Sequence, residues 1–191
     1  MRTTSEKIAS IARRVVEREG SDAVGIRRIA GAAGLSAMAF YRHYRDRDAL
    51  LNVIADAGFD ELAGRLRSKR LTGTPTGKLV RLMDVYLDFS LEHPRLFELM
   101  FLEKRAGARR FPADFGAGRS PTANVVAAVV KQGIESGFFK KLDVWEVVFT
   151  AGAQAHGLTL LFLGGRIDWK PAQFRAFYRR SFRRLFDAFR A

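Results

Sequence analysis

Residues 26–50 constrain the fold more than any other part of this sequence. Apolar spacing predicts a short helix over 27–33, and Gly34 suits a left-handed turn that other residues resist. Ser36 then fits the N-cap of a second short helix, expected over 37–44. Two short helices joined by a glycine turn form the helix-turn-helix plan, whose second helix has the size to enter the major groove of DNA.

The flanking segments complete a helical unit around this pair. Thr3 and Glu6 have the spacing of a capping box, which predicts a first helix that ends near Gly20. Asp46 fits the N-cap of a fourth helix that runs to about Lys69. A three-helix unit over residues 1–48 is therefore expected.

The remainder of the chain also predicts helices. Apolar residues recur at helical spacing, and no segment shows the sustained alternation of a strand. The turn-rich stretch 72–77 and the stretch 105–120 are expected to be loops. The expected fold is all-α with about nine helices, a helix-turn-helix domain over 1–48 and a helical domain over 49–191. The later helices are expected over 78–92, 95–104, 121–136, 144–163 and 174–189.

The charge of the chain favours a polyanionic partner. Thirty-three Lys and Arg against 20 Asp and Glu give a net charge of +13. Residues 1–48 carry +4 of this charge and the remaining residues carry +9. The charge distribution therefore does not locate the DNA-binding part, whereas the helix-turn-helix pattern does. A solubilising surface is the alternative explanation of the charge.

Several classes of chemistry find no support. The chain has no cysteine, and its three histidines, His43, His93 and His156, lack metal-ligand spacing. Residues 116–120 lack the length and lysine of a phosphate-binding loop, and no serine has the context of a nucleophile. No enzyme activity, metal or cofactor is expected.

The sequence also predicts a cytoplasmic protein without a membrane partner. The first residues lack the apolar run of a signal peptide. The charge-free stretch 147–165 has the length of a membrane span, but it contains Gln154 and His156, which hydrocarbon tolerates poorly. A buried helix is expected there.

The second helix of the pair has an outward face that suits DNA. Helical geometry places Met38, Ala39 and Arg42 opposite Phe40 and Tyr44. Small apolar groups meet thymine methyls, whereas arginine reads guanine. The candidates for base contact are Arg27, Ala37, Met38, Ala39 and Arg42. Tyr41, His43 and Arg47 suit phosphate contacts, and free cap amides near Gly25 and Asp46 offer further anion contacts. Arg28 and Ser36 are further DNA-binding candidates. Ordinary solvated charges remain the alternative for the arginines, and a structural role remains the alternative for His43.

The segment from Ile8 to Leu51 resembles the TetR family of transcriptional regulators. The resemblance rests on Ile29-Ala30-x-x-Ala33-Gly34-Leu35-Ser36, Phe40-Tyr41-x-His43-Tyr44 and Arg47-x-Ala49-Leu50. It implies a homodimer on an inverted-repeat operator, with a C-terminal domain that senses a small molecule. It also implies base-facing positions for Arg27, Ala37, Met38, Ala39 and Arg42, and backbone-contacting positions for Tyr41, His43 and Arg47.

Two residues depart from this family pattern. Gly25 stands where family members usually have a threonine at or next to the cap of the second helix, so the hydroxyl contact is lost. Met38 stands where a small residue is usual, and its bulk affects how closely the helix approaches the bases.

The C-terminal part offers candidates for an effector site and a dimer interface. The family resemblance implies dimerisation through the last two helices, and the aromatic stripe over 174–189 has the apolar density for it. Burial of the same stripe within one chain is the alternative. Candidate effector residues, each with ordinary core packing as its alternative, are Met83, Tyr86, Phe89, Phe97, Met100, Phe101, Phe149, Gln154 and His156.

Together these features predict a ligand-responsive, sequence-specific DNA-binding regulator. Its expected action is repression, relieved when a small molecule releases it from double-stranded DNA. Two alternatives stay open: a sequence-tolerant architectural DNA-binding protein, and a protein-interaction module on a degenerate DNA-binding scaffold.

Overall fold

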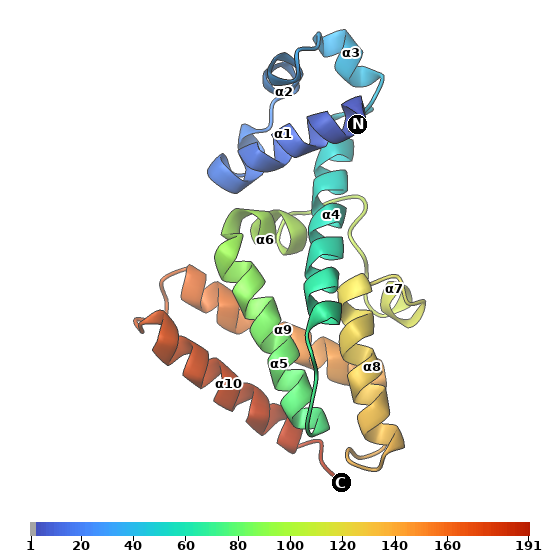
Figure 1. Cartoon of the computed structure of the whole chain (residues 1–191), viewed down its shortest axis with the longest axis vertical. Helices are drawn as coiled ribbons and strands as arrows, with labels where there is room; N and C mark the ends of the chain where they lie inside the picture. Colours follow the sequence, from blue (N-terminus) through green and yellow to red (C-terminus); the bar gives the residue numbers. More distant parts are fainter. Residues whose placement is uncertain (1–2) are drawn as a thin grey trace. The chain divides into compact units, whose positions relative to one another are not determined.

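The computed structural model describes residues 3–191 as an all-helical chain (Figure 1). Within this range there are ten α-helices and one short 3₁₀-helix, η1. The α-helices are α1 (Thr4–Glu19), α2 (Ile26–Ala33), α3 (Ala37–Tyr41), α4 (Arg47–Ser68), α5 (Pro75–Glu92), α6 (Pro94–Phe101), α7 (Ala113–Gly116), α8 (Pro121–Glu135), α9 (Val144–Leu163) and α10 (Pro171–Asp187); η1 covers Ser21–Ala23.

The helices form two compact units that interleave along the sequence. The first unit contains residues up to Asp60 together with His93–Ala108, and the second contains Glu61–Glu92 together with Arg109–Ala191. The first unit thus holds α1–α3, most of α4, and α6. The helix-turn-helix shares its compact unit with α6, a helix that lies far along the sequence.

Local signals in the first unit act as the sequence predicts. The Thr3 hydroxyl accepts from the Glu6 amide at 3.2 Å, and the Glu6 carboxylate accepts from the Thr3 amide at 2.8 Å, which completes the capping box. Gly34 ends α2 in the left-handed conformation, with φ 74°. Asp46 caps α4 by accepting from the Ala49 amide at 2.7 Å.

Several boundaries differ from the expected ones, among them the end of α6 at Phe101 and the start of α10 at Pro171. The third helix ends at Tyr41, because the amides of Arg42 and His43 turn back to carbonyls three residues earlier. Helix α5 begins at Pro75, inside the expected loop, since proline fits the first turn of a helix. The one-turn α7 within 105–120 accounts for the tenth helix.

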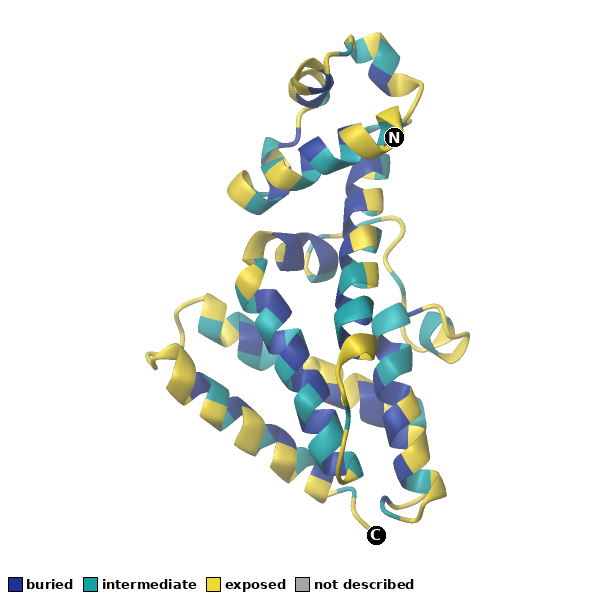
Figure 2. Cartoon of the chain, in the orientation of Figure 1, coloured by how far each residue is buried: buried dark blue, intermediate teal, exposed yellow. Residues whose placement is uncertain are grey.

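The second unit is built around the pairing of α5 with α8, α9 and α10. Figure 2 shows buried and exposed residues alternating along α10. Its buried aromatic side chains, all fully enclosed within this one chain, are Phe174, Tyr178, Phe182 and Phe186. The alternative of burial within a single chain is therefore the correct one for these four residues.

Helix α9 is buried along one face only. Its enclosed residues include Val147, Ala151 and Thr159, whereas Phe149 is 46% and Leu161 is 47% exposed. Among the described helices, α9 alone has the length and apolar composition to cross a membrane, which for a single helix is weak evidence. The expectation of a buried helix thus holds for one side of α9, and the other side presents an apolar surface.

Candidate nucleic-acid interface

Aromatic packing holds α3 in place within the helix-turn-helix. Phe40 and Tyr44 are buried, with ring centroids 5.8 Å apart. The Tyr44 hydroxyl accepts from the Ser5 hydroxyl at 2.9 Å and donates to the Ser5 carbonyl at 3.0 Å. The bonds to Ser5 attach Tyr44 to α1, and the burial of Phe40 and Tyr44 confirms their predicted inward positions.

Five exposed side chains lie on α2, on α3 and directly after α3. Met38 is 74% and Tyr41 is 51% exposed, and Arg27, Arg42 and His43 are also exposed. In the described part of the chain, the side chains of Arg27, Arg42 and His43 form no hydrogen bond or ion pair. We call these five residues the HTH face; they combine apolar surface with free cationic and polar groups.

The other candidates on these helices differ in accessibility, and Ser36 is exposed. Ala37 and Ala39 are half-buried, and the Ser36 hydroxyl accepts from the Ala39 amide at 3.1 Å as the N-cap of α3. Gly25, the N-cap of α2, is exposed and has no side-chain bond to the helix. The free backbone amides at the start of α2 thus receive no acceptor from a side chain of the N-cap.

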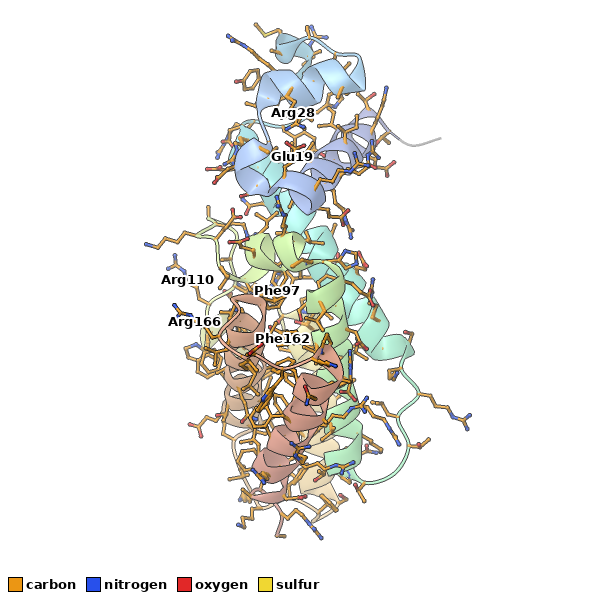
Figure 3. The ribbon with its side chains drawn as sticks, turned by 90° about the vertical axis from the view of Figure 1, so that its left-hand side faces the viewer. Glu19, Arg28, Phe97, Arg110, Phe162 and Arg166 are labelled. Atoms are coloured by element: carbon orange, nitrogen blue, oxygen red, sulfur yellow. The ribbon has the colours of Figure 1, made fainter. Side chains whose placement is uncertain are left out.

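Arg28 forms a surface ion pair with Glu19 of the same chain. Its guanidinium donates to both carboxylate oxygens of Glu19, at 2.5 and 2.8 Å, and to the Ala23 carbonyl at 3.3 Å (Figure 3). This hydrogen-bonded guanidinium lowers the pKa of the Glu19 carboxyl. Arg28 therefore joins α2 to the end of α1.

Arg47 also donates to the protein itself. Its Nη2 lies 2.7 Å from the Ser21 carbonyl oxygen and its Nε lies 3.0 Å from the Val24 carbonyl oxygen. Sequence periodicity gives no sign of these bonds, because they join residues 23 and 26 positions apart. The bonds tie the start of α4 to the turn before α2.

Two basic residues in this unit were not among the sequence candidates. The side chain of Arg45 is 89% exposed and pairs with Asp46 at 2.8 Å. The sequence signal that could have singled it out is its place in the basic stretch with Arg42 and His43. Lys7 donates to the Ala33 carbonyl at 2.8 Å and so supports the end of α2.

The structure divides the effector candidates between the two units. Phe97, Met100 and Phe101 lie in the first unit, where Phe101 packs on Phe97 with a centroid distance of 4.8 Å. The candidates in the second unit are Met83, Tyr86, Phe89, Phe149, Gln154 and His156. Phe149 stacks on Phe111 at 4.2 Å on the surface.

A polar cluster lies among the apolar side chains of α5, α9 and α10. The Tyr86 hydroxyl and His156 Nδ1 are 3.1 Å apart, and Gln154 donates to the Ser181 hydroxyl at 2.9 Å. The Tyr178 and Thr159 hydroxyls are fully buried, and by hydrogen-bond geometry neither has a partner among the described residues. Burial raises the pKa of Tyr86 and Tyr178 and lowers that of His156, so the cluster is uncharged at neutral pH.

His156 gives the folded protein a predictable pH dependence. Its folded-state pKa is lowered from 6.5 by burial, so below that pH the unfolded chain binds a proton that the folded protein resists. The free energy of unfolding is expected to fall as the pH drops from 7.5 through 6.5 toward the folded pKa. Urea unfolding at pH 7.5 and 5.5 measures this, and His156→Gln should remove that part of the difference. His43→Gln, at an exposed histidine, should keep it; equal slopes for all three proteins would contradict the prediction.

Metal ligands do not gather anywhere in residues 3–191. The described residues contain no group of three or more His, Cys, Asp or Glu that could hold a metal ion.

Comparison with protein families gives two matches that together span most of the chain. Residues 3–62 match the model of bacterial regulatory proteins of the tetR family. Residues 79–189 match the model of the tetracyclin repressor-like C-terminal domain. No functionally curated protein matches the chain.

Solved structures share the fold over nearly the whole chain. A protein of unknown function from Rhodococcus sp. RHA1 is 26% identical with a TM-score of 0.80, covering 96% of this chain and 95% of that one. A TetR-family transcriptional regulator from Streptomyces coelicolor is 21% identical with a TM-score of 0.72, covering 98% and 83%. The fatty acid degradation regulator FadR from Bacillus halodurans is 15% identical with a TM-score of 0.73, covering 97% and 95%.

Proposed function

Because the chain belongs to the TetR family of bacterial regulatory proteins, we propose that it is a cytoplasmic repressor that a small molecule releases from an inverted-repeat operator. The observation that carries the DNA-binding part is the HTH face, where exposed cationic groups lie beside exposed Met38 on a helix-turn-helix. Residues 1–48 bind DNA in this proposal, and residues 49–191 bind the effector and a second copy.

The HTH face supplies both kinds of DNA contact in this proposal. Arg27 and Arg42 donate to guanine edges, and Met38 meets thymine methyls with its flanking residues Ala37 and Ala39. Tyr41 and His43 bind phosphates, together with the backbone amides that follow Gly25 and Ser36. Arg28 keeps its bond to Glu19 and thereby holds α2 against the end of α1.

The homodimer is supported by the apolar surface of α9. A Cβ added at Gly152 or Gly157 would meet no atom within 4 Å, and Ala153 between them is exposed. Small residues allow a partner helix to approach closely, and Leu161 extends the apolar surface toward the end of α9. The main aromatic side chains of α10 are buried within the chain, so they are not free for a second copy. Helix α9 is therefore the centre of the proposed interface.

Ala153→Arg tests this interface. The new cation would lie on the exposed side of α9, where it is expected to convert the dimer to a monomer without unfolding the chain. Sedimentation velocity measures the mass, and thermal unfolding checks the fold. Ala128→Arg, at an exposed alanine on α8, is the matched control and should stay dimeric. A dimer for Ala153→Arg would contradict an α9-centred interface.

The effector site is proposed at the polar cluster of the second unit. His156 and Tyr86 already share one bond, and the buried hydroxyls of Tyr178 and Thr159 have unused hydrogen-bonding capacity. Since the cluster is uncharged, the part of the effector that reaches it is an uncharged donor or acceptor group. An effector that weakens operator binding 100-fold must itself bind the DNA complex about 100-fold less tightly.

Selection of bound duplexes from a random DNA pool at about 150 mM salt tests the function, because this salt suppresses much non-specific phosphate binding. Enrichment of an inverted repeat is the expected result, and that operator then serves to find releasing molecules. DNA binding without enrichment would overturn the proposal in favour of an architectural protein. No binding at all would favour a protein-interaction module.

A further inference from the structure

The turn between α1 and α2 determines where α2 begins. It consists of the single 3₁₀ turn Ser21–Ala23, followed by Val24 and the N-cap Gly25. The N-cap contributes no side-chain hydrogen bond to α2. The start of α2 therefore depends on backbone geometry and on contacts that the turn receives from other residues.

Arg47 makes the long-range contacts of this turn. Its Nη2 donates to the Ser21 carbonyl at 2.7 Å, and its Nε donates to the Val24 carbonyl at 3.0 Å. The Ser21 carbonyl also accepts the Val24 amide at 2.9 Å, so Arg47 binds both ends of the turn at once. Arg47 is the first residue of α4, and its two bonds join α4 directly to the entry of α2.

Two carboxylates of the same chain lie near the guanidinium of Arg47. Nη2 lies 3.7 Å from an Asp22 carboxylate oxygen, and Nη1 lies 3.7 Å from one of Asp48. Arg27 and Arg42 on the HTH face have no such partners. Of these three arginines, Arg47 is the one whose donors and charge are already engaged without DNA.

We propose that Arg47 is a positioning residue for DNA binding: it fixes the turn that leads into α2 and holds no phosphate itself. The proposal rests on the proposed function, because it assumes that α2 and α3 bind DNA. Arg47 does not replace the missing cap acceptor at Gly25; it holds two carbonyls of the turn that leads into α2. Arginine suits this task, because its planar guanidinium presents several donors in a fixed fork that two carbonyls can share.

Salt dependence separates a positioning role from a phosphate contact. Each phosphate that a protein cation neutralises adds about 0.9 to the slope of log affinity against log salt concentration. Arg47→Gln is expected to weaken binding to the selected operator about tenfold or more while leaving this slope unchanged. Affinity for a random duplex should change little.

Hydrogen exchange in the free protein provides a second measurement that needs no DNA. The amides of Val24 and Ile29, which bond to the Ser21 and Gly25 carbonyls, should exchange at least tenfold faster in Arg47→Gln than in the wild type. Arg47→Lys keeps the charge without the fork, so it should recover the operator affinity only in part. It also keeps the test valid if Arg47→Gln unfolds.

A slope reduced by about 0.9 in Arg47→Gln, with unchanged exchange at Val24 and Ile29, would overturn the proposal and make Arg47 a phosphate contact. Full recovery by Arg47→Lys would overturn it too, because a point charge would then suffice. Failure of the proposed function looks different: the wild type itself would select no operator, whereas the exchange experiment would still show whether Arg47 holds the turn.

Discussion

Replacing Arg27 and Arg42 together with alanine is expected to weaken operator binding at least thirtyfold. Both side chains are exposed and form no hydrogen bond or ion pair with the residues that the structure describes, so they are free to bond base edges. A bidentate arginine–guanine pair contributes about 1–3 kcal/mol of discrimination, and two such losses correspond to about thirtyfold or more. Fluorescence anisotropy with the selected operator and with a random duplex, at about 150 mM salt, measures the change. The loss should be larger for the operator than for the random duplex.

The matched control for this pair is Arg67→Ala with Arg70→Ala. These arginines are also exposed, and they belong to the second unit, near and beyond the end of α4. Their removal lowers the net charge by the same amount, so it reveals any loss caused by long-range attraction alone. An equal loss in both double variants would contradict the base-contact role of Arg27 and Arg42.

Gly133→Ala is expected to lower the free energy of unfolding by about 2–3 kcal/mol, which is a large part of a typical domain's stability. A Cβ at this position of α8 would lie 2.3 Å from Phe139 Cδ2 and 3.2 Å from Pro75 Cβ. Phe139 is 3% exposed, so its ring cannot move aside without displacing buried neighbours. Urea unfolding followed by circular dichroism measures the effect as a lower midpoint.

Gly64→Ala is the control for this substitution. An added Cβ at Gly64 in α4 meets nothing within 4 Å, and alanine has the higher helix propensity by up to about 1 kcal/mol. Gly64→Ala is thus expected to raise the midpoint slightly. A Gly133→Ala protein as stable as the wild type would show that Phe139 repacks freely, against the expectation.

The predictable parts of the fold are those that neighbouring residues encode. The capping box at Thr3, the left-handed Gly34 and the cap at Ser36 each act within a few residues, so the sequence alone places them. The end of α3 was harder, because Tyr44 keeps its predicted inward position although the helix stops three residues earlier. The inward-facing positions therefore continue to Tyr44, beyond the last helical residue Tyr41.

The candidate site was predictable as a surface but not as a set of bonds. Exposure of Met38 and Arg42 follows from helical spacing against Phe40. The bonds of Arg28 and Arg47 depend on which carboxylate or carbonyl the folded chain brings near them, and no sequence period encodes that. Basic residues on these helices therefore look alike in the sequence, whereas the structure divides them into free and engaged groups.

The separation of free from engaged arginines has an evolutionary consequence. Met38 is 74% exposed, and Arg27 and Arg42 form no hydrogen bond or ion pair within residues 3–191, so exchanges there alter operator preference at little cost to folding. Arg47 and the Glu19–Arg28 pair hold backbone that every operator variant needs. Among relatives that share Gly25, positions 27, 38 and 42 are therefore expected to diverge as new operators arise, while an arginine persists at position 47. In such a lineage, a new target sequence requires only surface substitutions, while the contacts that position α2 stay the same.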